Sequence, residues 1–551
     1  PNQKPNQKPN QKPNQKPNLR HNKETYKLTT IPEIIEDAFE RFRDQEAMVD
    51  ENIRWNFSEY RNQIYLTARA FIERGVKTGD RIAIWAPNNA YWAVAALGAH
   101  CAGAVLVPIN TRFKGEEAAY ILKSTSAKLL FTVSDFLDIN YVDLLSEKEA
   151  ELELEETIIL KGSTPGNCTS WESFIESGNL IEESQLKTRS EQVSDNDLCH
   201  ILFTSGTTGT PKGAMLEHGA VCRSYRTWCD VIGLTSTDRY LVINPFFHTF
   251  GLNAGILACL MTGATLIPHP IFDVPSVMKR IPEEKISMLP GAPTIYQTIL
   301  NHPDLDNYDM SSLRLAVTGA AAIPVEMIHG MREKLGFETV VTGYGLTEAS
   351  GIATMCRHND DPEIIATTSG KAIDGVEIRL IDDNGSETPV GEPGEVLIRG
   401  YNIMRGYLDD PLQTAEVIDA EGWLHTGDIG ILDASGYLDI TDRKKDMIIT
   451  GGFNVYPAEV ENILLSHPKI GQVAVVGTTD PRMGEIGVAF VILAPNSHII
   501  KDDLIHWSRK RMANFKVPRE VKFVSSLPTN ASGKVLKYEL REAVKKINEE
   551  N

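Results

Sequence analysis

The chain has 551 residues, more than one hydrophobic core normally serves, so two to four domains are expected. Its 42% hydrophobic and 23% charged residues are typical of soluble globular proteins, and a formal charge of −19 argues against nucleic acid or an anionic membrane as a general partner. The longest apolar stretch, residues 92–108, is interrupted by His100, so no transmembrane segment is predicted; we expect a buried helix and strand.

The seven cysteines are scattered, odd in number and without a C-x-x-C pair. This usage indicates a reducing compartment without disulfides or structural zinc. No secretory signal is recognised, so a cytoplasmic location is expected.

The N-terminal residues 1–18 repeat Pro-Asn-Gln-Lys and lack apolar side chains, so residues 1–24 are predicted to be a disordered tail. Beyond it the patterns predict helices over 31–39 and 58–73, a strand over 81–85, a helix ending near 97 and a strand over 104–108. Strands that alternate with helices favour parallel βαβ units and an α/β fold.

A loop rich in glycine and hydroxyl side chains, Thr204–Gly213, follows a short apolar strand, 201–203, predicted to be buried on both faces. Its glycines free backbone N–H groups and Lys212 adds a positive charge, which suits a polyphosphate. It lacks the Gly-Lys-Ser/Thr ending of a Walker loop, and a flexible turn is the alternative. A helix with Val221, Tyr225, Trp228 and Ile232 on its core face should follow.

The second half of the chain contains further strand patterns at 313–318, 339–342 and 395–399, with a turn at 391–394. The charged segment 442–446 is a candidate boundary, followed by expected strands 447–450, 472–476 and 488–493 and helices 457–465 and 501–513. This predicts a separate α+β domain of about one hundred residues. The acidic run 147–156 is interpreted as a solvated surface.

Five further features carry candidate chemistry. Tyr344–Glu348 follows a strand, where open parallel sheets bind ligands, and a carboxylate beside a phosphate site suits Mg²⁺. Thr426–Asp428 is predicted to be a tight turn whose acid pairs with sugar hydroxyls. Arg443 stands at the boundary, Gly451-Gly452 allows close approach to the backbone, and Asn530–Lys534 presents a lysine. Taken singly, Thr347-Glu348 could be a helix start, Thr426–Asp428 an ordinary turn and Gly451-Gly452 a hairpin.

In this order and spacing, the phosphate loop and these motifs resemble the adenylate-forming superfamily, which includes acyl-CoA synthetases, aryl-CoA ligases, luciferases and peptide-synthetase adenylation domains. The resemblance covers nearly the whole chain from about Thr25 to Ile547. It implies a large N-terminal AMP-binding (adenylation) domain, 25–443, of doubly wound βαβ subdomains with a small β-barrel-like subdomain. This domain would be hinged to a mobile α+β C-terminal domain, 444–551.

The resemblance also implies site residues. The nucleotide site would comprise Thr204, Ser205, Gly206, Thr207, Thr208, Gly209, Lys212, Ala320, Ala321, Tyr344, Gly345, Asp428 and Arg443. The phosphate loop would hold the β- and γ-phosphates of ATP, Tyr344 would stack on adenine, and Asp428 with Arg443 would bind ribose. Thr347 would contact the α-phosphate and Glu348 would hold Mg²⁺.

The implied reaction has two steps. A carboxylate attacks the α-phosphorus of ATP, which releases pyrophosphate and leaves an acyl-AMP, and the thiol of coenzyme A then takes the acyl group. Lys534 would bridge carboxylate and α-phosphate in the first step, Lys445 would be the hinge, and Gly452 would line the CoA tunnel. Residues 501–551, with 12 Lys+Arg against 7 Asp+Glu, would face the CoA phosphates.

The acyl pocket would include His248, Phe250, Gly319 and Gly343, with His248 as a gate that moves as the acid enters. Gly343 and Gly345 would leave space, which favours an acid bulkier than acetate. Residues 245–252 look most like medium- or long-chain fatty-acyl-CoA synthetases, and Thr354–Arg357 resembles the branch that activates ring-bearing propanoates.

Other functions stay open at this point. They are a coumarate-type aryl-CoA ligase, an adenylation enzyme acting on a separate carrier protein, a luciferase-like oxygenase, and a nucleotide-binding scaffold without catalysis. The expected partner is a small-molecule carboxylic acid; the sequence does not indicate an oligomeric state.

Overall fold

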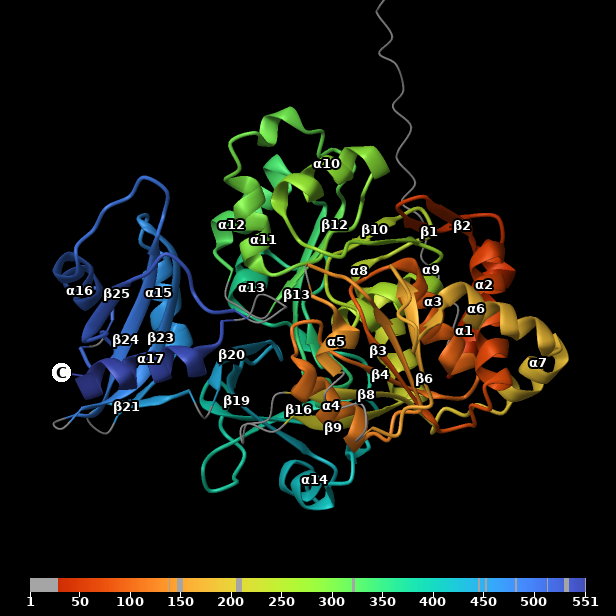
Figure 1. Cartoon of the computed structure of the whole chain (residues 1–551). Coiled ribbons are helices and arrows are strands. Elements are labelled where there is room, and N and C mark those ends of the chain that lie inside the picture. The colour runs from red at the N-terminus through yellow and green to blue at the C-terminus, as the bar shows by residue number, and fades with distance from the viewer. Residues whose placement is uncertain are drawn as a thin grey trace, which may run out of the picture.

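The computed structural model (Figure 1) describes residues 28–137, 139–145, 152–204, 211–319, 323–443, 446–450, 453–480, 483–512, 514–529 and 535–550. Within these ranges it describes no side chain for residues 294, 442, 443, 449, 453, 454 and 547–550. The predicted tail, most of the acidic run and the central part of the phosphate loop lie outside the described residues.

The largest sheet has eight strands in the order β18-β9-β8-β4-β3-β5-β6-β7. These are β3 (Arg81–Trp85), β4 (Val105–Pro108), β5 (Leu129–Val133), β6 (Glu156–Lys161), β7 (Thr169–Ser170), β8 (Leu198–Thr204), β9 (Lys212–Glu217) and β18 (Gly406–Tyr407). The run from β8 to β7 is parallel, as the βαβ pattern predicts, whereas β9 is antiparallel to β8 and β18 is antiparallel to β9.

The helices of this part precede or connect the parallel strands. They are α2 (Phe57–Glu73), α3 (Ala90–Cys101), α4 (Gly115–Ser124), α5 (Tyr141–Leu145), α6 (Trp171–Ser177), η3 (Gly178–Leu180) and α7 (Glu183–Glu191). In Figure 1, α4 and α5 lie to one side of β3, β4 and β6, and α3 and α6 lie to the other. Both faces of the sheet are therefore covered, and the apolar stretch at 92–108 is the buried helix α3 and strand β4.

The second layer of strands consists of two four-stranded sheets, β10-β11-β1-β2 and β12-β13-β14-β15. They are joined through parallel bridges of Met288 with Tyr240 and Leu315. Its strands are β1 (Glu46–Asp50), β2 (Ile53–Asn56), β10 (Arg239–Val242), β11 (Thr265–Pro268), β12 (Leu315–Gly319), β13 (Thr339–Tyr344), β14 (Thr354–Met355) and β15 (Lys371–Ala372). Its helices are α1 (Ile31–Phe42), α8 (His218–Ile232), the π-helix η4 (Phe250–Leu257), α9 (Ala258–Thr262), α10 (Val274–Glu284), α11 (Pro293–Leu300), η5 (Leu305–Asn307), α12 (Val325–Lys334), η6 (Thr347–Ala349) and α13 (Pro362–Thr367).

A smaller antiparallel sheet, β16-β17-β19-β20, completes the large part of the molecule and forms a half-barrel. It contains β16 (Val376–Ile381), β17 (Pro393–Gly400), β19 (Leu424–Leu432) and β20 (Leu438–Arg443), with α14 (Pro411–Val417) between β18 and β19. Thr426–Asp428 lies inside β19, so the prediction of a tight turn is wrong. The pairing register of β17 with β19 shifts between Glu395 and Leu397, and Gly427 has φ +68°. Together these features mark a β-bulge, and its Gly-Asp sequence is one that turns also use.

The C-terminal elements form a sheet of their own, β22-β21-β24-β23 with β25 beside β24. They are β21 (Ile448–Thr450), β22 (Phe453–Val455), α15 (Pro457–Leu465), β23 (Ile470–Asp480), β24 (Gly484–Leu493), α16 (Lys501–Arg509), β25 (Glu520–Phe523) and α17 (Lys537–Glu550). Alternate residues of β23 and β24 enter two separate cores, one with α15 and α16 and the other with α17. The predicted domain limits stay predictions, since residues 444–445 lie outside the described part.

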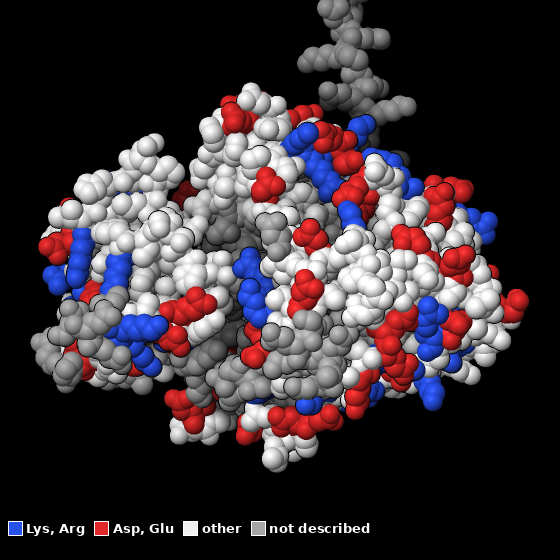
Figure 2. Space-filling view, viewed as in Figure 1, with Lys and Arg blue, Asp and Glu red and all other residues white. Residues whose placement is uncertain are grey.

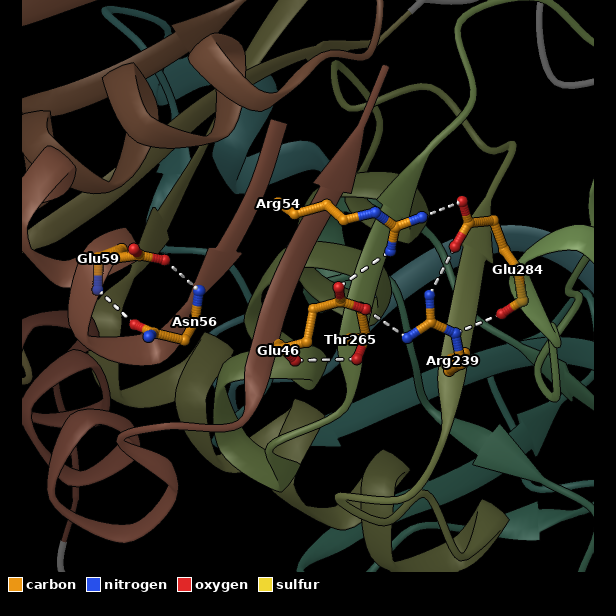
Figure 3. A network of polar contacts seen from close by, with 7 residues as sticks. All are labelled: Glu46, Arg54, Asn56, Glu59, Arg239, Thr265 and Glu284. Atoms are coloured by element: carbon orange, nitrogen blue, oxygen red, sulfur yellow. Dashed lines mark hydrogen bonds and ion pairs between the residues drawn. The ribbon is translucent and has the colours of Figure 1, made fainter. Parts of the chain in front are cut away.

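Local sequence explains why the helices begin where they do. Thr30 caps α1: its hydroxyl accepts the backbone N–H of Glu33, and the Glu33 carboxylate accepts the N–H of Thr30. Asn56 and Glu59 form the same reciprocal cap at α2 (Figure 3). In α8, the predicted face of Val221, Tyr225, Trp228 and Ile232 is buried.

A polar network, Glu46–Arg54–Arg239–Glu284, joins strands β1, β2 and β10 to helix α10 (Figure 3). Arg54 donates to Glu46 at 3.0 Å and to Glu284 at 2.6 Å, and Arg239 donates to the same two carboxylates. Thr265 also donates its hydroxyl to the Glu46 carbonyl at 2.9 Å. Partial burial alone would raise the pKa of Glu46, but hydrogen bonds from Arg239 and Arg54 outweigh burial and hold the pKa below its ordinary value.

Glu46→Gln should reduce the free energy of unfolding by about 1 kcal/mol at pH 7, because it removes a charged acceptor from a partly exposed pair of arginines. A carboxylate with a lowered folded-state pKa stabilises the fold above its unfolded pKa and loses that contribution as pH falls through the folded value. The difference from wild type should therefore shrink below about pH 4. Urea unfolding between pH 7 and pH 3 measures it, with Glu283→Gln on the exposed side of α10 as control. A difference independent of pH would contradict the assignment.

Candidate functional site

The two described ends of the phosphate loop lie opposite each other. Thr204 ends β8 and Lys212 begins β9, and the two residues pair in register across the antiparallel strands. The loop therefore connects two strands rather than a strand and a helix. Its predicted phosphate ligands between these ends, Ser205, Gly206, Thr207, Thr208 and Gly209, lie outside the described residues.

Glu348 stands beside this loop. Its Oε1 accepts the hydroxyl of Thr204 at 3.3 Å and the hydroxyl of Tyr407 at 2.9 Å. Lys212 lies over the Tyr407 ring, with its ammonium 5.4 Å from the ring centroid, and donates to the side chain of Gln413. The structure thus brings the acidic motif and the ends of the phosphate loop, which are far apart in sequence, into one site.

Tyr407 and Gln413 are site residues that the sequence analysis missed. Tyr407 lies on β18, which pairs with β9, so the strand that carries Lys212 also positions Tyr407. Burial and, next, the Glu348 carboxylate raise the pKa of Tyr407 above its usual range, so its hydroxyl stays protonated and donates. The one sequence signal is Gly406-Tyr407 just before the Pro-initiated helix α14, and a two-residue strand is too short to reveal its partner.

The backbone around Glu348 is held by the segment that precedes Tyr407. Met404 donates its N–H to the Glu348 carbonyl at 2.8 Å. The buried side-chain amide of Asn402 donates to Ile352 O at 2.8 Å, and the backbone carbonyl of Asn402 accepts the Ser350 hydroxyl at 2.8 Å. Thr347 begins the short helix η6, directly before Glu348. This support fixes where the carboxylate stands.

The predicted adenine and ribose residues also meet. Tyr344 at the end of β13 donates its hydroxyl to Asp428 Oδ2 at 2.6 Å, and Asp428 is 5% exposed. Asp428 and Arg443 are register partners in β19 and β20, although the Arg443 side chain is not described. The bulge at Gly427 turns this acid toward Tyr344.

The predicted acyl residues follow neighbouring parallel strands. His248 and Phe250 come after β10, Gly319 ends β12, and Gly343 is its register partner in β13. The bridges through Met288 place β10 and β12 in one continuous sheet, so these positions share its carboxyl edge. His248 is exposed and its Nδ1 accepts the Phe250 N–H at 3.2 Å.

The expectation that Gly343 and Gly345 leave open space in the acyl pocket is wrong. A Cβ on Gly343 would stand 2.9 Å from the Thr354 carbonyl, and one on Gly345 would stand 2.4 Å from the Gly351 carbonyl. Neighbouring backbone already fills the side where a Cβ would point. These glycines allow close packing of β13 with the following segment, and they do not by themselves enlarge a pocket.

The remaining predicted residues, Ala320, Ala321, Lys445, Gly452 and Lys534, lie outside the described part of the chain, so their roles stay predictions. Figure 2 shows a hollow between the C-terminal elements, at the left, and the large part, with lysine and arginine side chains beside it. The segments that flank Lys534 and Gly452 belong to the C-terminal elements.

The residues present fit a magnesium ion that is shared with ATP. The hydroxyls of Thr204 and Tyr407 both donate to Oε1 of the Glu348 carboxylate, so Oε2 could hold a cation. Magnesium is commonly bound by one or two carboxylates together with substrate phosphates. Among the described residues, no group of three or more His, Cys, Asp or Glu is arranged to hold a metal ion by itself.

Comparisons with known proteins agree with this geometry. Residues 35–408 match the model of the AMP-binding enzyme family, and residues 459–534 match that of the AMP-binding enzyme C-terminal domain. The 3-[(3aS,4S,7aS)-7a-methyl-1,5-dioxo-octahydro-1H-inden-4-yl]propanoyl:CoA ligase of Rhodococcus jostii is 46% identical over 95% of this chain and 100% of its own length. The mitochondrial medium-chain acyl-CoA ligase ACSF2 of Mus musculus is 33% identical over 93% of this chain and 87% of its own.

Solved structures extend the likeness to the fold. The anthranilate CoA ligase AuaEII in complex with anthranoyl-AMP has a TM-score of 0.86 at 29% identity, covering 94% of this chain and 98% of its own. ATP-bound MatB from Rhodopseudomonas palustris has a TM-score of 0.82 at 27% identity, covering 94% and 99%. These likenesses confirm the predicted fold class and two-step reaction.

None of the helices within the described ranges has the length and apolarity to cross a membrane. The chain belongs to the AMP-binding enzyme family: it is an AMP-forming acid–thiol ligase that uses ATP and CoA to convert a small carboxylic acid to its acyl-CoA through acyl-AMP.

Proposed function

We propose that the acid is a bulky propanoate attached to a fused bicyclic ring, of the kind named for the Rhodococcus jostii relative. The observation that carries this proposal is 46% identity over essentially the full length of that ligase, with 45% to the Mycobacterium tuberculosis ligase of the same name. Identity to the medium-chain ligase of Mus musculus is only 33%. The sequence likeness of Thr354–Arg357 to the same branch points the same way.

The acyl pocket proposed here opens at the carboxyl edge of β10, β12 and β13. Phe250 starts a π-helix, η4, whose wider turn is a common device at functional sites. The Phe250 ring lies edge-on to Trp228 with centroids 6.3 Å apart, so a rigid aromatic wall supports it. A rigid wall suits a fused ring better than a flexible chain, because a fused ring has little conformational freedom to lose when it binds.

For the nucleotide, the proposal assigns adenine to Tyr344, ribose to Asp428 and Arg443, and the leaving pyrophosphate to Thr204, Lys212 and the loop between them. Thr347 would contact the α-phosphate, and Lys534 would approach it from the C-terminal side. Glu348 would hold Mg²⁺, which supplies charge neutralisation when bound. Tyr407 donates to Glu348 and keeps that carboxylate oriented.

The substrate is tested by measuring kcat/KM for CoA-thioester formation with the bicyclic propanoate, octanoate, decanoate and anthranilate. We expect the bicyclic acid to be preferred by about tenfold or more, since each mismatched group in an apolar pocket is worth about 1–3 kcal/mol. A higher value for octanoate or decanoate would replace the proposal with a medium-chain function. A higher value for anthranilate would indicate an aryl-CoA ligase.

Asp428→Ala should weaken ATP binding by about tenfold or more, because a charged acceptor for ribose is lost from a buried position. Isothermal titration calorimetry with a non-hydrolysable ATP analogue measures this affinity. Tyr344→Phe is the matched variant, since it removes the hydroxyl bonded to Asp428 but keeps the ring that would stack on adenine. Its affinity should stay within about threefold of wild type. Unchanged affinity in Asp428→Ala would contradict the ribose assignment.

The compartment remains part of the proposal. None of the seven cysteines, all of which lie in the described ranges, forms a disulfide, and six of them are buried. This supports the expected reducing, cytoplasmic surroundings.

A further inference from the structure

Among the described residues, two hydrogen bonds join the large part of the molecule to backbone carbonyls of the C-terminal elements. Arg112 Nη1 donates to Thr529 O at 3.1 Å, and Gln297 Nε2 donates to Gly471 O at 3.3 Å. Each donor is a side chain of the large part. Thr529, the acceptor in the first contact, directly precedes the segment that contains Lys534.

Arg112 extends from a rigid base. Asn110 Oδ1 accepts the backbone N–H of Arg112 at 3.0 Å, while the Asn110 carbonyl accepts the indole N–H of Trp85 at 3.0 Å. Tyr141 donates its hydroxyl to Thr111 O at 3.0 Å. The rings of Trp85 and Tyr141 are buried with centroids 4.5 Å apart, so the loop after β4 is anchored in the core. A side chain on such a base can hold a partner in a defined place.

Thr529 lies at the base of the lysine segment. It forms an antiparallel bridge with Val535, and Leu536 donates its N–H to Pro528 O at 2.8 Å. These contacts join the described residues on either side of positions 530–534. A group that holds Thr529 therefore also determines where the base of this segment stands.

The helix that follows Arg112 also reaches the phosphate loop. Tyr120 in α4 donates its hydroxyl to Pro211 O at 3.3 Å, and its ring lies edge-on to Phe203 with centroids 6.3 Å apart. The stretch 110–124 thus contacts the base of the lysine segment at one end and the phosphate loop at the other.

We propose that Arg112 is a positioning residue for the adenylation step: by binding Thr529 O it holds the residues that directly precede the Lys534 segment against the large part of the molecule. This inference rests on the role proposed for Lys534 above. The family resemblance implies a hinged motion of the C-terminal domain between the two steps, and this contact would then break before thioester formation. A single exposed hydrogen bond to a carbonyl suits this, because it adds little to the free energy needed for the motion.

The test compares the two half-reactions in the full-length enzyme. Adenylation is followed by ATP–pyrophosphate exchange with whichever acid wild type uses best, and thioester formation is followed from supplied acyl-adenylate and CoA. In Arg112→Ala the ratio of the first rate to the second should fall about three- to tenfold, the effect of one lost hydrogen bond. Arg112→Lys keeps a cationic donor. It should recover at least half of the fall in this ratio seen in Arg112→Ala, measured on a logarithmic scale. Lys114→Ala removes an equal charge from an exposed position two residues along and should leave the ratio as in wild type.

A second measurement separates positioning from general damage. Hydrogen–deuterium exchange of a peptide covering 528–536 should be faster in Arg112→Ala, with unchanged exchange in β23 and β24. An equal loss in both half-reactions, or no change in the ratio, would overturn the proposal. Lys534→Ala, assayed in parallel, tests the lysine assignment separately. Because the assay uses the best acid found, a wrong substrate proposal would not affect the result for Arg112.

Discussion

Glu348→Gln is expected to slow acyl-adenylate formation by about 10²- to 10³-fold, the usual cost of removing one electrostatic contact to the reacting phosphates. The amide oxygen can still accept from Thr204 and Tyr407, so the local structure should persist while the negative charge is lost. A single-turnover measurement of acyl-AMP at several Mg²⁺ concentrations checks this. The loss should be smaller at high Mg²⁺ if the carboxylate holds the ion.

Two further variants test whether this effect is specific to the Glu348 carboxylate. Tyr407→Phe keeps the ring beside Lys212 but removes the hydroxyl donor to Glu348, and should slow adenylation by about tenfold through poorer orientation. Glu217→Gln changes a carboxylate that pairs with Arg405 and lies at the far end of β9, the strand that carries Lys212, and it should change adenylation less than twofold. If Glu348→Gln kept wild-type rates at low Mg²⁺, the carboxylate would have no role in holding the ion.

Lys534→Ala is expected to reduce adenylation by about 10²-fold or more, since a cation at the α-phosphate would be lost from the transition state. Thioester formation from supplied acyl-adenylate should remain, because that step would use the other orientation of the C-terminal domain. ATP–pyrophosphate exchange and thioester formation are measured side by side. The control is Lys545→Ala, an exposed lysine of α17.

Retention of pyrophosphate exchange in Lys534→Ala would remove the lysine from the first step. Equal loss in both steps would assign it a structural role instead. A lysine that acts only in adenylation should also leave ATP affinity within a few-fold of wild type, whereas Asp428→Ala should not.

Local patterns predicted much of the fold. Strand β3 and helix α15 have the predicted bounds, and α1 begins at its Thr30–Glu33 capping box. These elements depend on neighbouring residues along the chain, so the sequence carries their signal. Thr426–Asp428 was misread because a Gly-Asp pair is typical of turns, while its bulge in β19 depends on pairing with β17, a separate strand.

The candidate site was predicted where its residues form consecutive motifs, as at Tyr344–Glu348. Tyr407 and Gln413 were missed because their relation to Glu348 and Lys212 arises only when β18 pairs with β9. The glycines at 343 and 345 were interpreted as open space, but their need arises from carbonyls of residues 354 and 351 that pack against them.

The sequence by itself therefore determined the reaction class and the two-step chemistry, because phosphate, acid and lysine motifs each occupy short stretches whose order is readable. Only the tertiary structure decided which groups support one another. Thr204 with Glu348, Tyr344 with Asp428 and Arg112 with Thr529 are contacts between residues 84 to 417 positions apart. Such contacts follow from packing of whole sheets and helices, and no local periodicity or propensity encodes them.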